Sequence, residues 1–158
     1  PIPIIRELVD LNGVIDEILE NTKLSPDWTD KIKVSLSLTK NVIAYANKEQ
    51  LRQAIYNLVM NSIQAMKDGG SLSISTKIIR HGDSKEVAEI KVTDTGCGID
   101  EKDLKKVFEP FFTNKEKGTG LGLTIVSRIV DGYNGRMMIE SSINKGTTCT
   151  IWLPCNKK

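Results

Sequence analysis

Residues 50–66 read QLRQAIYNLVMNSIQAM, the longest helical pattern in the chain. Apolar side chains recur there at the three- and four-residue spacing of an α-helix that buries one face. The pattern predicts a helix from about residue 48 to residue 66, ended by the glycine pair at 69–70. The buried face comprises Leu51, Ile55, Leu58, Val59, Ser62, Ile63 and Met66.

The opposite side of this helix carries a narrow stripe of amides, namely Gln53, Asn57, Asn61 and Gln64. Asn57 and Asn61 are four residues apart, so their side chains lie one above the other. Asparagine is a poor residue for a helix interior because its side chain competes for backbone hydrogen bonds. The stripe is either a solvated surface or a pair of neutral oxygen ligands that could hold Mg²⁺ beside phosphates. The helix alone leaves both readings open.

The rest of the chain alternates pairs of strands with helices. Period-two patterns predict strands over 32–38, 71–79, 87–93, 136–142 and 148–153. Helical spacing predicts helices around 14–19 with Asp10 or Asn12 as the cap, at about 101–107, and after the glycines at 118–122 to about 131. This order predicts a two-layer α/β sandwich with a mixed, mostly antiparallel sheet and helices on one face. It disfavours a Rossmann fold, which needs strict βαβ alternation.

Composition narrows the function classes. The chain has 158 residues, a net charge of +2, one histidine and three cysteines without CxxC spacing. The near-neutral charge argues against a nucleic-acid partner, and the cysteine spacing argues against a zinc site. Unpaired thiols favour a reducing compartment, so we expect a cytoplasmic location. No apolar run approaches the roughly 18 residues needed to span a bilayer, so we expect no membrane contact by this chain. Residues 1–10 are expected to be a linker and residues 11–158 one domain.

Residues 94–98 read DTGCG and follow a predicted strand. A carboxylate at a strand end could accept a hydrogen bond from an exocyclic amino group such as that of adenine. Gly96 and Gly98 would let the backbone approach such a ligand closely. The alternative is a plain turn.

Residues 118–123 read GTGLGL and open a helix. Alternating glycines leave backbone N–H groups open, and the start of the helix adds partial positive charge, an arrangement that suits phosphate. The alternative is a merely flexible loop. The chain contains neither GxxxxGK[ST] nor a GxGxxG with the strand and acidic residue of a dinucleotide site.

Residues 108–112 read FEPFF, followed by TNKEK at 113–117. Exposed aromatic residues suggest a hinge or lid anchor, with a core-facing helix end as the alternative. The polar TNKEK stretch could close over a ligand, and Lys115 could reach a phosphate.

The segments NLVMN, DTGCGI, FEPFF and GTGLGL, followed by GTT at 146–148, stand in an order that resembles one family. It is the catalytic ATP-binding domain of bacterial two-component sensor histidine kinases, in the wider group of DNA gyrase, mismatch-repair ATPases and heat-shock chaperones. The stretch FEPFFTNK, residues 108–115, is most similar to the nitrogen-regulator class of sensor kinases. The resemblance implies a Bergerat-type ATP-binding fold with ATP and Mg²⁺ as cofactors.

The resemblance assigns roles residue by residue. Asn61, with Asn57, would hold Mg²⁺ against the triphosphate, and Lys115 would join them in catalysis. Asp94 would bind the adenine amino group, and Thr147 would lie at the adenine end. The other cofactor-binding positions are Gly96, Gly98, Ile99, Phe108, Phe112, Gly118, Thr119, Gly120, Leu121, Gly122 and Leu123. Phe111 would belong, with Phe108 and Phe112, to the aromatic group that flanks the lid.

Two positions depart from the family pattern, and a third distinguishes the chain from the related ATPases. Gln64 stands where many relatives have a basic residue, so phosphate charge would fall to Lys115 or Lys117. Asn47 stands where relatives often have aspartate, yet it remains a good N-cap. Asn57 stands where the related ATPases carry the glutamate that activates water. A neutral amide cannot take that proton, so the pattern predicts phosphoryl transfer rather than hydrolysis.

The resemblance implies a histidine acceptor on a separate upstream helical domain and relay to an aspartate of a response regulator. His81 lies in a predicted turn and is not expected to be that acceptor. We expect this chain to be monomeric, within a homodimeric full-length protein that could be membrane-bound. The alternatives are a nucleotide-sensing module and an anti-sigma-type serine kinase of the same fold.

Overall fold

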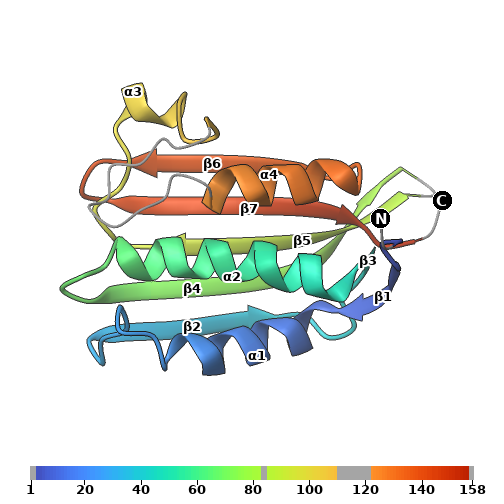
Figure 1. Ribbon diagram of the computed structural model, residues 1–158, viewed down its shortest axis with the longest axis horizontal. Helices are drawn as coiled ribbons and strands as arrows, with labels where there is room; N and C mark the ends of the chain where they lie inside the picture. Colours follow the sequence, from blue (N-terminus) through green and yellow to red (C-terminus); the bar gives the residue numbers. More distant parts are fainter. Residues whose placement is uncertain (1–2, 83–84, 110–121, 157–158) are drawn as a thin grey trace.

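The computed structural model describes residues 3–82, 85–109 and 122–156 (Figure 1). Along the chain, the elements are β1 (Glu7–Asp10), α1 (Leu11–Thr22), β2 (Ile32–Leu38), β3 (Ile43–Ala46), α2 (Lys48–Gln64), β4 (Gly70–His81), β5 (Lys85–Asp94), α3 (Glu101–Leu104), α4 (Gly122–Gly132), β6 (Arg136–Ser142) and β7 (Gly146–Pro154).

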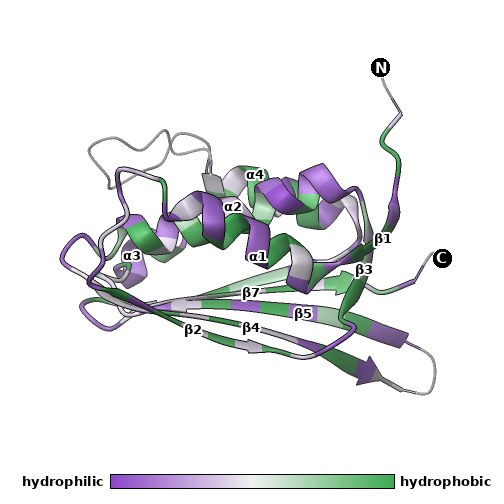
Figure 2. Ribbon diagram, turned by 90° about the horizontal axis from the view of Figure 1, so that it is seen from below, coloured by the Kyte–Doolittle hydropathy of each residue, from purple (hydrophilic) through white to green (hydrophobic). Residues whose placement is uncertain are grey.

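Five strands form the main sheet in the order β2-β4-β5-β7-β6. β2 pairs with β4 in parallel, whereas β4 with β5, β5 with β7, and β6 with β7 are antiparallel. Helices α1, α2 and α4 lie side by side over one face of this sheet (Figure 2). The predicted fold class, a two-layer sandwich with a mixed and mostly antiparallel sheet, is confirmed.

The core lies between these helices and the sheet. The predicted apolar face of α2 is buried, with Leu51, Ile55 and Ile63 each at most 1% exposed. These side chains pack in one cluster with Ile74, Ile90 and Ile151 of the central strands. Burial of such aliphatic side chains is the main favourable term in folding, and it fixes α2 against the sheet. The polar stripe on the opposite side of α2 therefore faces away from the sheet.

Two short strands, β1 and β3, were not predicted from the sequence. β1 and β3 pair antiparallel in a separate two-stranded sheet, with Glu7 opposite Ala46 and Asp10 opposite Ile43. Four-residue strands are too short for a period-two pattern to stand out. β1 lies within the stretch expected to be a linker, and the linker role of residues 1–10 stays a prediction.

Other boundaries shifted slightly. Of the two predicted caps of α1, Asp10 accepts the hydrogen bond from the Asn12 backbone N–H, at 3.1 Å. The helix predicted at 101–107 is shorter, and turns follow Leu104. His81 is the last residue of β4, opposite Lys85 across the hairpin. None of the described helices is long and apolar enough to cross a membrane.

Candidate functional site

The site is built around the C-terminal end of α2. Asn57 and Asn61 are both half-buried, one helical turn apart, with the buried face of α2 on one side and exposed Gln53 on the other. Because Asn47 caps the helix and accepts from the Gln50 N–H at 3.0 Å, the register of the stripe is fixed from its first turn.

The start of α4 lies against this stripe. A Cβ atom built on Gly122 would stand 3.8 Å from both Oδ1 and Nδ2 of Asn61. Asn61 and Gly122, about sixty residues apart in the chain, therefore meet in space. Leu123, half-buried, packs against the core and holds this end of α4 in place.

Asp94 is a buried carboxylate, 4% exposed, at the last position of β5. Its Oδ1 accepts from the Gly96 N–H at 2.9 Å and from the Thr147 N–H at 3.3 Å. Two backbone donors compensate part of the cost of burying a negative charge and fix the orientation of the carboxylate. The predicted residues Asp94 and Thr147 are thus brought into direct contact.

The glycines around Asp94 are approached closely by protein backbone. A Cβ on Gly96 would lie 2.5 Å from the Ala65 carbonyl oxygen at the end of α2. Gly98 has a φ of +72°, and its Cβ would lie 1.9 Å from the Ser142 carbonyl oxygen. A side chain at either position would push the 94–98 loop away from α2 or from β6. Contact of these glycines with a ligand stays a prediction.

Ser141 is a member of the site that the sequence patterns missed. Its Oγ accepts from the Ile99 N–H at 2.8 Å, lies 2.7 Å from Thr147 Oγ1 and donates to the Gly146 carbonyl oxygen at 3.0 Å. The strand register, Ser141 opposite Thr147, creates this junction. Because the register is not readable from one strand alone, nothing in the local sequence distinguished Ser141 from its neighbour Ser142.

Of the segment between α3 and α4, the structure describes residues 105–109. Phe108 is 39% exposed, and its carbonyl oxygen accepts from Thr124 Oγ1 at 3.0 Å. Phe108 is thereby tied to the first turn of α4. The other predicted residues of this region, Phe111, Phe112, Lys115, Lys117, Gly118, Thr119, Gly120 and Leu121, lie outside the described residues.

Gln64, at the position where the resemblance places a basic residue, is half-buried. Its Nε2 donates to Asp27 Oδ2 at 3.1 Å, in the segment between α1 and β2. This bond links the end of α2 to that segment.

The three cysteines have different environments. Cys97 is exposed, whereas Cys149 and Cys155 are buried. Burial, and secondly the negative charge of Asp94, raise the pKa of the Cys149 thiol to about 12. Cys149 is therefore a protonated packing residue at neutral pH, and it lies near the carboxylate of Asp94.

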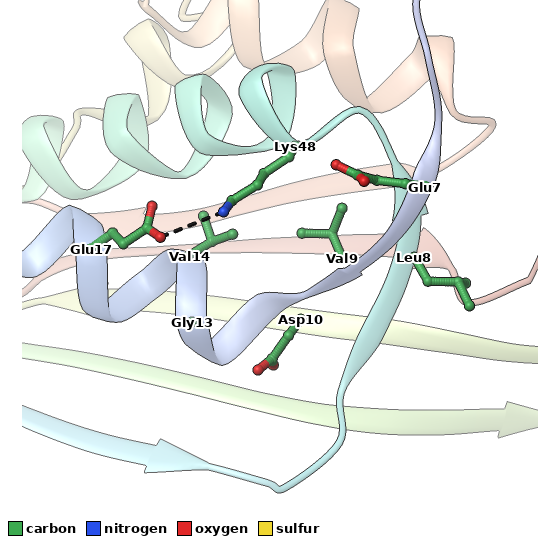
Figure 3. A pocket seen from close by; sticks show the side chains of 8 residues that line it. All are labelled: Glu7, Leu8, Val9, Asp10, Gly13, Val14, Glu17 and Lys48. Carbon is green, nitrogen blue, oxygen red and sulfur yellow. Dashed lines mark ion pairs between the residues drawn. The ribbon is translucent and has the colours of Figure 1, made fainter.

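A separate open hollow of about 310 Å³ lies between β1, α1 and the first residue of α2 (Figure 3). Glu7, Asp10 and Glu17 line it, and the only cation in its lining is Lys48, which pairs with Glu17 at 3.6 Å. A lining with three carboxylates repels polyanions, so this hollow does not suit a triphosphate. The site at the other end of α2 is the better candidate.

Comparison with known proteins gives a consistent family. The profile of the histidine kinase-, DNA gyrase B- and HSP90-like ATPases matches residues 46–157. Sensor histidine kinase ZraS of Escherichia coli K12 is 35% identical over 99% of this chain. Sporulation kinase D of Bacillus subtilis 168 is 36% identical over 94% of it. The chain covers 32% and 28% of those two proteins, about a third of their length.

Solved structures agree. The mycobacterial sensor histidine kinase MprB superimposes with a TM-score of 0.80 at 28% identity, covering 95% of this chain and 97% of that one. The expected family is confirmed by sequence and fold together. The chain belongs to the histidine kinase-, DNA gyrase B- and HSP90-like ATPases, and within them it is homologous to the catalytic domains of sensor histidine kinases.

Proposed function

We propose that this chain binds Mg-ATP between α2, the loop after β5 and the start of α4, and donates the γ-phosphoryl group to a histidine on a separate helical domain. One observation carries the proposal. The 94–98 loop is pressed against the end of α2 at Gly96, so a buried carboxylate lies beside the helix whose Asn61 faces the start of α4. Asp94, which would bind the adenine base, and Asn61, which would lie beside the phosphates, then belong to one site.

At the adenine end, Asp94 would accept a hydrogen bond from the amino group of the base. The carboxylate is acceptor-only when ionised, and two backbone N–H groups already orient it. Thr147, Ile99, Gly96 and Gly98 would border the base. This polarity selects adenine over guanine, whose corresponding position is a carbonyl oxygen.

At the phosphate end, the chemistry of the donors fits Mg²⁺. Asn61, with Asn57 one turn before it, offers neutral amide oxygens, and Mg²⁺ commonly keeps waters and phosphate oxygens as its other ligands. In the described part of the chain, no group of three or more His, Cys, Asp or Glu side chains could hold a metal by itself. When bound, Mg²⁺ would supply charge neutralisation at the phosphates.

The γ-phosphoryl group would be held by backbone N–H groups of the second glycine segment, from Gly118 to Gly122, by Thr119 and by Lys115. Phe108 and Phe112 would flank this segment. Positioning and charge neutralisation supply most of the rate enhancement in phosphoryl transfer, so these groups need no proton chemistry of their own.

Transfer is favoured over hydrolysis because of Asn57. An amide cannot accept the proton of an attacking water, whereas a neutral imidazole nitrogen of the acceptor is already a nucleophile. The acceptor histidine would lie on an upstream helical dimerisation domain. Its phosphoryl group would then pass to an aspartate of a response regulator receiver domain. The chain itself would act as a cytoplasmic, monomeric donor within a homodimeric kinase.

The test supplies this chain with γ-labelled Mg-ATP and a separate helical acceptor domain of a related sensor kinase. We expect a phosphoprotein that is labile in acid and stable in base, as phosphohistidine is. Asn61→Ala should reduce the transfer rate by at least about tenfold, while Gln53→Ala, on the exposed side of the same helix, should not. Absence of label would favour a nucleotide-sensing module, and acid-stable label would favour a serine kinase.

A further inference from the structure

Residues 3–6, which we call the entering chain, precede β1. Two of them, Ile5 and Arg6, are each bound at the end of a different helix. The Ile5 carbonyl oxygen accepts from Asn47 Nδ2 at 2.9 Å, at the N-cap of α2. The Arg6 guanidinium lies 4.8 Å from the centroid of the Tyr133 ring and donates to the Gly132 carbonyl oxygen at 3.1 Å, at the C-terminal end of α4. A cation at a helix C-terminus is favoured by the helix dipole.

The two attachment points are also joined to each other. Tyr133 is 4% exposed, and its hydroxyl accepts from the Asn47 N–H at 3.0 Å while it donates to Gln50 Oε1. A buried tyrosine with both hydroxyl bonds satisfied is a rigid support for a stacked guanidinium. We call the set of Ile5, Arg6, Asn47, Gln50 and Tyr133 the anchor.

Asn47 performs two tasks, and only an amide can perform both. Its Oδ1 accepts from the Gln50 N–H and caps α2, and its Nδ2 donates to Ile5. Aspartate would cap the helix equally well, but it has no donor and would set a carboxylate against the Ile5 carbonyl oxygen. Asparagine at this position is therefore what ties the entering chain to α2.

The anchor and the candidate nucleotide site lie at opposite ends of the same two helices. At one end Tyr133, which follows α4, bonds to Asn47, and at the other end Gly122 of α4 lies beside Asn61. The helices are thus antiparallel, with the termini of the chain on the anchor side (Figure 1). An α-helix of seventeen residues is a stiff element about 25 Å long, so a tilt at one end is felt at the other.

We propose that Arg6, Asn47 and Tyr133 are positioning residues that hold the entering chain in one orientation and couple it to the nucleotide site through α2 and α4. The coupling rests on the proposed function, because it needs a bound nucleotide. The attachment of the entering chain does not.

Trypsin cleavage after Arg6 measures the attachment directly, since the Arg6 side chain must leave Tyr133 and Gly132 to enter the protease. In the whole chain without nucleotide, Asn47→Asp should raise the rate of this cleavage by about tenfold, the effect of losing one hydrogen bond of about 1.4 kcal/mol. Asn41→Asp, the same change at an exposed loop residue, should not. An equal cleavage rate in Asn47→Asp and the wild-type chain overturns the anchor. Cleavage after Lys91, which lies within the central strand β5, monitors global unfolding.

The coupling is tested by adding Mg²⁺ and the non-hydrolysable analogue AMP-PNP. Saturating analogue should slow cleavage after Arg6 by at least about twofold in the wild-type chain and have less effect in Asn47→Asp, as linkage requires. A bound analogue with the same effect on both chains, or none, overturns the coupling. If calorimetry detects no binding of the analogue, the proposed function fails, while the comparison without nucleotide still tests the anchor.

Discussion

At the scale of single residues, hydrogen bonds from backbone N–H groups orient the central carboxylate. Asp94 accepts from Gly96 and Thr147, and Thr147 is in turn bound to Ser141. A buried acceptor in such a network has a fixed direction, which is the property that base recognition needs. The quality of the site therefore depends on residues behind Asp94 as well as on Asp94 itself.

Ser141→Ala tests that dependence. The change leaves the Ile99 N–H without its acceptor and removes the hydroxyl beside Thr147. We expect the dissociation constant for ATP to rise by about tenfold, equivalent to about 1.4 kcal/mol. Ser141→Thr should restore most of the affinity, and Ser142→Ala should bind as the wild-type chain does. Equal affinities in Ser141→Ala and Ser142→Ala, measured by titration calorimetry, would show that the junction has no part in binding.

Cys149 links the same region to alkaline stability. Burial and Asp94 raise the pKa of its thiol to about 12, above the value of about 8.5–9 in an unfolded chain. The folded state therefore keeps a proton that the unfolded state loses, and stability falls as the pH rises from about 9 toward 12.

The expected difference is measurable by urea unfolding at pH 8 and pH 10. Relative to Cys149→Ala, the wild-type chain should lose about 1–2 kcal/mol more of its unfolding free energy between these two values. The comparison cancels every pH effect that the two proteins share. Identical pH dependence in the two proteins would mean that the thiol is not shielded.

The placement of residues in the candidate site was predictable from the sequence where a motif fixed it and not otherwise. Asp94 and Thr147 were assigned by resemblance, and the structure brings them into contact. Ser141 was missed because its role depends on the cross-strand register between β6 and β7. The second role of Asn47, holding Ile5, was missed because a cap motif says nothing of a contact forty residues away.

At the scale of elements, the hairpin of β6 and β7 clamps the loop after β5. The Asn144 N–H donates to the Cys97 carbonyl oxygen at 2.8 Å, and Gly98 accommodates the Ser142 carbonyl oxygen where no side chain would fit. Strand pairing between β5 and β7, with Asp94 opposite Thr147, sets how closely the loop after β5 approaches the β6–β7 hairpin. The clamp explains why glycine occurs at residue 98.

Gly98→Ala measures the clamp. The substitution adds a positive-φ strain of about 1–2 kcal/mol and a clash with backbone that adds about 1–3 kcal/mol. Gly82→Ala is the matched control, because Gly82 has a φ of +66° and nothing lies within 4 Å of its added Cβ. Urea unfolding should show a clearly larger loss for Gly98→Ala. Similar losses in both variants would mean that the loop and the hairpin are not clamped.

Element prediction succeeded for long periodic segments and failed for short ones. The pattern of α2 gave its buried face, because seventeen residues sample that face repeatedly. β1 and β3 have four residues each and are stabilised by pairing with each other, which no local pattern reports. The helix expected over 101–107 is four residues long, Glu101–Leu104, and none of these four residues is buried.

At the scale of the whole molecule, α2 and α4 connect the candidate nucleotide site to the anchor. The candidate nucleotide site occupies one end of α2 and α4, and the anchor that receives the entering chain occupies the other. The fold class was predictable because the order of strand pairs and helices constrains how layers can pack.

Adenine recognition by Asp94 is the central feature of the candidate site, and titration calorimetry with Mg-ATP tests it most directly. The wild-type chain should bind ATP and discriminate against GTP. Asp94→Asn should weaken ATP binding by at least about tenfold, because an amide presents a donor where the carboxylate only accepts. Asp68→Asn, the same change at an exposed residue, is the control. ATP binding by Asp94→Asn with the affinity of the wild-type chain would contradict the assignment of the site.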